Sequence, residues 1–182
     1  MITSSHLNQT QPIKVDLFKI SVTQYFIREW EKVKESILLS IPSSNDAEKH
    51  IGFTDYFEEN DAKYKKNIFK ILEPYLQEFC KTSLYKFTGI SNMWCQRYNA
   101  RDYHVPHDHG ALGYSCVFYA KMSEEHPGTL FFSPFNDETG THACNSVACK
   151  EGDLIIFPSN LMHMAPPHDS EEERVIISFN LV

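Results

Sequence analysis

The strongest constraint on the fold is a series of short apolar runs in the C-terminal half, each ended by turn-forming residues. The runs are rich in β-branched and aromatic residues and short enough to be strands. We expect strands at NMWCQRY (92–98), YSCVFYA (114–120), TLFFSPF (129–135), NSVAC (145–149), DLIIF (153–157) and RVIISFNLV (174–182). Many short strands at this spacing are typical of a β-sandwich, barrel or jelly roll.

The N-terminal half has a different pattern. Residues Val15–Ile27 are compatible with an outlying strand, and apolar residues at helical spacing predict helices over 29–41 and 62–82. Pro42 and the polar cluster at 43–46 should end the first helix. We expect both helices to cover one face of the sheets.

Length and charge limit the functional class. The 182 residues, of which 42% are hydrophobic and 23% charged, fit one globular domain. The net charge of −7 argues against a general nucleic-acid or membrane-surface binder, although a local basic patch is still compatible with it. The N-terminus lacks the pattern of a secretory signal, no apolar stretch reaches membrane-spanning length, and the five cysteines contain no CxxC pair. We therefore expect a cytoplasmic protein with reduced thiols.

Histidines gather in the segment Tyr103–Gly110, which reads YHVPHDHG. If the segment is extended, its period of two puts His107 and His109 on one face and turns Asp108 away. Two imidazoles at this spacing can bind one metal ion. The alternative is a polar loop whose histidines are merely solvated.

A second segment supplies a third histidine. Lys150–His168 contains a Gly-Asp turn, an apolar strand closed by Pro158, and then His163 in an apolar stretch. Alone, His163 could be a hydrogen-bonded core histidine. Together with the upstream pair, it is the natural third ligand of a facial metal site.

Arg174 opens the final strand, where it would share a face with Ile176 and Ser178. A guanidinium can bind a carboxylate through two parallel hydrogen bonds, and the Ser178 hydroxyl could add another. Arg174 could equally be a rim residue that pairs with the acidic run 171–173.

Taken in order, the segments WCQRYNARDYHVPHDHG, GYSCVFY, PGTLFF, EGDLIIFPSNLMH and ERVIISFN resemble the Fe(II)/2-oxoglutarate-dependent oxygenases. The resemblance is nearest to a group of small oxygenases related to prolyl hydroxylases, and it covers about residues 92–182. It implies a mainly β protein with N-terminal helices, a double-stranded β-helix (jelly roll) with the helices packed on one sheet. Residues 1–182 would form a single domain, with 1–90 as N-terminal support and 91–182 as the catalytic core.

Carried onto this sequence, the resemblance makes His107, His109 and His163 the metal ligands. Arg174 would bind the distal carboxylate of 2-oxoglutarate with support from Ser178, and Tyr98 would place a phenol near it. The chain departs from the wider superfamily at His109, where most members carry Asp or Glu. Asp108 is therefore the competing ligand.

The activity implied is oxidation of a C–H bond with Fe(II), 2-oxoglutarate and O2 as cofactors and cosubstrate, releasing succinate and CO2. The substrate would be a small molecule or a peptide side chain, and the connections 99–103, 123–128 and 136–145 should line the mouth. Oligomeric state is left open by the sequence. Two alternatives remain: a three-His cupin-type dioxygenase that does not use 2-oxoglutarate, and a non-catalytic metal-binding β-sandwich module.

Overall fold

In the computed structural model, the described residues are 18–42, 52–58, 62–83 and 85–182. They form ten strands and two helices. In chain order these are β1 (Thr23–Phe26), α1 (Trp30–Leu38), β2 (Phe53–Thr54), α2 (Lys63–Ser83), β3 (Ile90–Tyr98), β4 (His104–His107), β5 (Tyr114–Lys121), β6 (Leu130–Asn136), β7 (His142–Ser146), β8 (Asp153–Pro158), β9 (His163–Ala165) and β10 (Arg174–Leu181).

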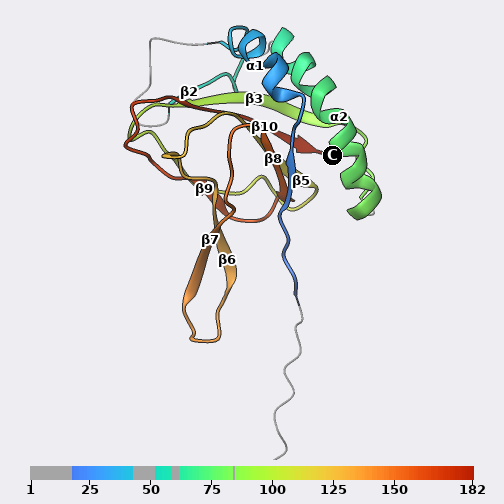
Figure 1. Ribbon diagram of the computed structural model, residues 1–182. Coiled ribbons are helices and arrows are strands. Elements are labelled where there is room, and N and C mark those ends of the chain that lie inside the picture. The colour runs from blue at the N-terminus through green and yellow to red at the C-terminus, as the bar shows by residue number, and fades with distance from the viewer. Residues whose placement is uncertain (1–17, 43–51, 59–61, 84) are drawn as a thin grey trace, which may run out of the picture.

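The strands form two antiparallel sheets. The larger has the order β1-β8-β5-β10-β3-β2, and the smaller has the order β4-β9-β6-β7. Helices α1 and α2 cover the outer face of the larger sheet, and the smaller sheet lies on its other side (Figure 1). The predicted arrangement, mainly β with the N-terminal helices on one sheet, is confirmed.

Strand β10 shows how alternation builds the two layers. Val175, Ile177 and Phe179 belong to the apolar core beneath the helices, whereas Ile176 belongs to a second core on the inner face. Burying side chains of this size stabilises a fold by roughly 1.5–3 kcal/mol each. The same period of two sends Arg174, Ser178 and Asn180 to the inner face, toward the smaller sheet.

Five of the six strands expected in the C-terminal half form close to their predicted limits, as do both helices. The predicted strand at 145–149 is wrong: β7 covers His142–Ser146 instead. Strand β7 pairs with β6 in a hairpin that projects from the body (Figure 1), and most of its residues are exposed. Without a buried face, its sequence carries no alternating pattern to locate it.

At the N-terminus, the strand expected over Val15–Ile27 is described only from residue 18 and is limited to Thr23–Phe26. The cluster at 43–46 lies outside the described residues, and α1 already ends at Leu38. Because β1 and β2 join the same sheet as strands of the C-terminal half, residues 1–90 supply edge strands as well as helices.

All five cysteines lie in the described part of the chain and are free thiols. Within that part, neither helix combines the length and apolar character needed to cross a membrane.

Candidate metal centre

Three histidines meet at the small sheet. His107 ends β4 and pairs in register with His163, which begins β9. His109 follows two residues after the end of β4, and its backbone N–H donates to the Ser159 carbonyl at 2.8 Å. The possible ligand atoms of the three imidazoles all lie within 4.8 Å of one another. The structure thus brings together the three residues predicted as metal ligands.

Each of the three rings is anchored through Nδ1. The Nδ1 of His107 lies 2.7 Å from the Val105 carbonyl, and that of His163 lies 2.8 Å from the Leu161 carbonyl. The Nδ1 of His109 lies 2.7 Å from Oδ1 of Asn180 and 2.9 Å from Oγ of Ser115. An Nδ1–H that donates to an oxygen leaves the Nε2 lone pair free to bind a metal, the usual arrangement for metal-ligating histidines.

Asp108 turns away from the other two members of the HDH segment. It is exposed, and its Oδ1 accepts a hydrogen bond from the Gly110 N–H at 2.9 Å. The strand itself ends at His107, so the segment is not fully extended. Even so, the rings of His107 and His109 lie nearly parallel, with centroids 5.2 Å apart.

Burial favours the neutral form of His109 and His163. It lowers the pKa of His163 to about 3, and it lowers the pKa of His109, although the hydrogen bond to Asn180 opposes that shift. His104, stacked on His107 with ring centroids 4.1 Å apart, also has its pKa lowered by burial, to about 4. Neutral imidazole is the form that coordinates a metal.

A cavity of about 570 Å³ opens beside the histidines. Its walls include His107, His109, Trp94 on β3, and the aromatic residues Tyr56 and Phe57 that follow β2. The expectation that the connections 99–103, 123–128 and 136–145 line this mouth is wrong. The walls come instead from the end of β2, the face of β3, the histidine segment and Asn180, because β2 lies at the sheet edge beside β3.

Arg174 is buried at the inner side of the large sheet, with 2% of its surface exposed. Its guanidinium lies over the Tyr98 ring, 4.6 Å from the centroid, as the pairing of Arg174 with Tyr98 in β10 and β3 requires. Nη1 donates to the Pro127 carbonyl at 2.7 Å and Nη2 to the Pro166 carbonyl at 3.0 Å. Its Nε and the Tyr98 hydroxyl are buried without a hydrogen-bond partner.

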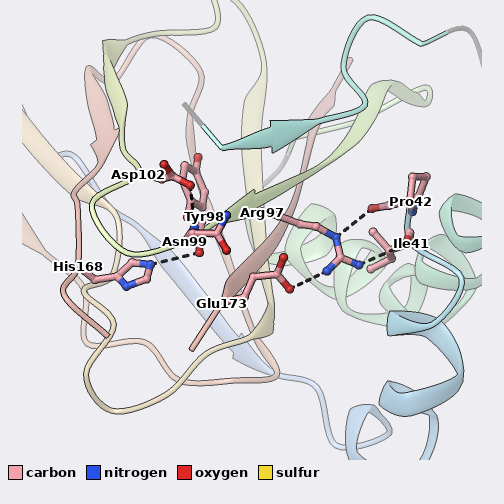
Figure 2. Close-up of polar contacts among 8 residues, drawn as sticks. All are labelled: Ile41, Pro42, Arg97, Tyr98, Asn99, Asp102, His168 and Glu173. Atoms are coloured by element: carbon pink, nitrogen blue, oxygen red, sulfur yellow. Dashed lines mark hydrogen bonds and ion pairs between the residues drawn. The ribbon is translucent and has the colours of Figure 1, made fainter. Parts of the chain in front are cut away.

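The neighbouring acidic run does not neutralise Arg174. Glu173 instead pairs with Arg97, at 2.6 Å, and Arg97 also donates to the carbonyls of Ile41 and Pro42 (Figure 2). Among the described residues, no carboxylate is within ion-pair distance of Arg174. Burial accordingly lowers the pKa of Arg174, and the guanidinium is a buried cation without a counter-charge.

Ser178 lies on the same face of β10, opposite Trp94, whereas Arg174 lies opposite Tyr98. Four residues of strand separate the two by roughly 13 Å at the backbone. Ser178, Tyr98 and His163 all line a small inner slot of about 20 Å³ that leads inward from the histidines.

Sequence reasoning missed the polar groups behind the histidines. Ser115 Oγ lies 2.9 Å from Asn180 Oδ1 and 3.0 Å from Ser159 Oγ, so Ser115 on β5 and Asn180 on β10 hold the His109 ring, while the Ser159 carbonyl accepts from the His109 N–H. Trp94, with its ring centroid 5.6 Å from that of His109, was also missed. Only the apolar-to-polar changes at Ser115 and Asn180 within otherwise buried strands could have marked them.

The ordered segments match a family model described as "Putative 2OG-Fe(II) oxygenase" over residues 92–180. That range contains the three histidines, Tyr98 and Arg174. Among curated protein sequences, none matches the chain.

Several solved structures share the fold. A prolyl hydroxylase from Trichoplax adhaerens, in complex with a hypoxia inducible factor oxygen degradation domain peptide, matches with TM-score 0.59 and 13% identity over 88% of this chain and 82% of that chain. A prolyl-4-hydroxylase from Pseudomonas putida matches with TM-score 0.57 and 13% identity, over 88% of this chain and 91% of that chain. HygX from Streptomyces hygroscopicus, with nickel, 2-oxoglutarate and hygromycin B bound, matches with TM-score 0.62 and 10% identity. The match covers 89% of this chain and 82% of that chain.

These matches confirm the double-stranded β-helix. The family match spans the HxH pair, His163 and Arg174 together, which favours an oxygenase over the cupin-type enzyme and the non-catalytic module. Over residues 92–180 the chain matches the Fe(II)/2-oxoglutarate-dependent oxygenases, a family of oxidoreductases that use Fe(II) and 2-oxoglutarate, and its three histidines could hold such a metal.

Proposed function

We propose that this protein is a dioxygenase that hydroxylates a small molecule or a peptide side chain. In this proposal His107, His109 and His163 hold the iron, and Arg174 and Tyr98 bind the distal carboxylate of 2-oxoglutarate. One observation carries it: three imidazoles, each anchored at Nδ1, line a slot together with Tyr98, and a buried, uncompensated guanidinium lies over the ring of Tyr98.

The donor set fits Fe(II). Imidazole nitrogen suits this metal, and three such ligands on one side leave the remaining positions open for other ligands. The Nδ1 hydrogen bonds fix the ring orientation and raise the basicity of Nε2. The hydrogen bond from His109 to Asn180 links this ligand to β10, the strand that also carries Arg174.

The inner residues fit a carboxylate. A guanidinium has five N–H donors, and Arg174 uses two of its nitrogens on backbone carbonyls, while its Nε is unpartnered. A buried donor without a partner costs about 1–3 kcal/mol, so a carboxylate that accepts from Nε and from the Tyr98 hydroxyl would relieve two such groups. The inner slot of about 20 Å³ holds roughly one water, so its side chains must move apart for the dicarboxylate.

In this proposal Ser178 also supports 2-oxoglutarate, but at a different position along β10 from Arg174. Its position opposite Trp94 puts it nearer the histidines, where its hydroxyl could contact the middle of a bound 2-oxoglutarate. Bound iron and 2-oxoglutarate supply the activation of O2 and the oxidation, with release of succinate and CO2. The chain orients both groups and, through Phe157 and Phe131 beside His163, limits water at the inner side.

The test is succinate formation from 2-oxoglutarate under air with Fe(II), first without any substrate. Wild-type protein should form succinate slowly, and His163→Ala should form almost none because one ligand is lost. The matched control is His142→Ala, an exposed histidine on β7, which should behave as wild type. Equal succinate formation by His163→Ala and wild type would contradict the proposed site.

A further inference from the structure

The cavity beside the histidines combines aromatic side chains with a single formally charged residue. Its lining contains three aromatic side chains (Tyr56, Phe57 and Trp94), and Asp108 is its one formally charged member. No Lys or Arg of the described residues lines it. We infer that the substrate carries an ammonium or other cationic group next to an apolar or aromatic part. This inference rests on the proposed function, because it assigns the cavity to the substrate.

The aromatic side chains form perpendicular walls. The Tyr56 ring meets Phe57 at 85° and Trp94 at 87°, with centroids 5.0 Å apart in both pairs. Phe57 is 87% exposed and Tyr56 is 47% exposed, so large apolar surface is left uncovered at the mouth. Ring faces attract cations as well as apolar groups, and an ammonium group binds over the face of such a ring.

Asp108 adds a negative charge at the same site. Asp108 is exposed and is one of the residues that line the cavity, while its neighbours His107 and His109 turn toward His163. Oδ1 accepts from Gly110, and within the described part of the chain Asp108 forms no ion pair. The negative charge of Asp108 would attract a cation bound against the aromatic rings, and it would repel a carboxylate in the same place.

The size of the cavity favours a small molecule. About 570 Å³ is typical of sites that bind a compact organic ligand, and three aromatic side chains stand in the wall among polar groups. Gln96 and Asn180 at the inner side, next to His104 and His109, could orient a hydroxyl or carbonyl on the uncharged end of the substrate.

Three probes with one carbon skeleton separate charge from shape: 3-phenylpropylamine, 3-phenylpropan-1-ol and 3-phenylpropanoate. Binding of each to the Fe(II)- and 2-oxoglutarate-loaded protein is measured anaerobically by titration calorimetry. The amine should bind about tenfold more tightly than the propanoate. In Asp108→Asn most of that preference should vanish, whereas Phe57→Ala should weaken all three probes. Asp169→Asn, at a side chain 97% exposed and outside the cavity, is the matched control and should keep the preference.

Equal or tighter binding of the propanoate would overturn the inference, as would the absence of amine binding or a preference that survives Asp108→Asn. The visible absorption of the iron–2-oxoglutarate complex, recorded on the same samples, tests the proposed function separately. Normal absorption without amine preference would reject only the substrate class. Amine preference without that absorption would reject only the cofactor assignment.

Discussion

His107, Asp108 and His109 carry potential metal-binding groups on consecutive residues, yet only the two imidazoles turn toward His163. Asp108 is held outward by its bond to the Gly110 N–H, and His109 is held inward by Asn180. In the proposed site, three neutral ligands would leave the charge of a ferrous ion uncompensated at the first coordination sphere. The Asp108 carboxylate then lies nearby without being a ligand.

Substitutions at these two positions separate the ligand from its neighbour. Asp108→Ala should keep its iron and much of its turnover of 2-oxoglutarate without substrate, whereas His109→Ala should lose most of both. His109→Asp should still bind iron, because two histidines and a carboxylate are the common set. The measurement is iron content after gel filtration, together with succinate formation. Iron loss in Asp108→Ala with retention in His109→Ala would assign the metal to His107, Asp108 and His163.

The sequence located the three histidines because their spacing and the strands on either side form one ordered pattern. It could not locate Asn180, Ser115 or Trp94, since these reach His109 only after β3, β5 and β10 pair. The resemblance suggested that Arg174 and Ser178 act on one carboxylate, but four strand residues separate them by roughly 13 Å.

At the level of elements, β10 organises the site. Its inner face presents Arg174, Ser178 and Asn180 in sequence, from the residue proposed to bind the distal carboxylate to the one that contacts His109. Strands with a buried face, such as β5 and β8, were predictable from their apolar runs. The short strands β4 and β9 were not, because β9 has three residues and β4 four, and the β4–β9 register shifts between His104 and His107.

Arg174→Ala should weaken 2-oxoglutarate binding on the order of 100-fold while iron stays bound, because the buried charged donor is removed. The affinity is measured by titrating the iron-loaded protein with 2-oxoglutarate in the absence of O2. Arg174→Lys keeps the charge but loses the planar fork, so it should recover only part of the affinity.

Since both Arg174 variants alter a buried residue, circular dichroism on the same samples checks that they fold. A folded Arg174→Ala protein with unchanged affinity would move the cosubstrate away from β10.

For the whole molecule, buried histidines tie stability to pH. Burial lowers the pKa of His163 to about 3 and of His104 to about 4, and it also lowers the pKa of His126. The unfolded chain takes up these protons near pH 6.5, while the folded chain does not. Folding stability therefore decreases as pH falls below about 6.5, by up to roughly 1.4 kcal/mol per pH unit for His163, the most deeply buried of the three, and by less for the other two.

Urea unfolding of the metal-free protein at pH 7.5, 6.5 and 5.5 measures this dependence above the range where carboxylates titrate. The free energy of unfolding should be lower at pH 5.5 than at 7.5, and added Fe(II) should raise it at pH 7.5. The same free energy at all three values would mean that the histidines are not held neutral by the fold.

In the proposed site, iron and 2-oxoglutarate meet at one open position formed by the three histidines and Arg174. The most direct measurement is the visible spectrum of the protein with Fe(II), taken anaerobically before and after 2-oxoglutarate is added. We expect a weak charge-transfer band that needs both components and is absent in His163→Ala. A wild-type protein that binds iron but gives no band with saturating 2-oxoglutarate would contradict the proposed site.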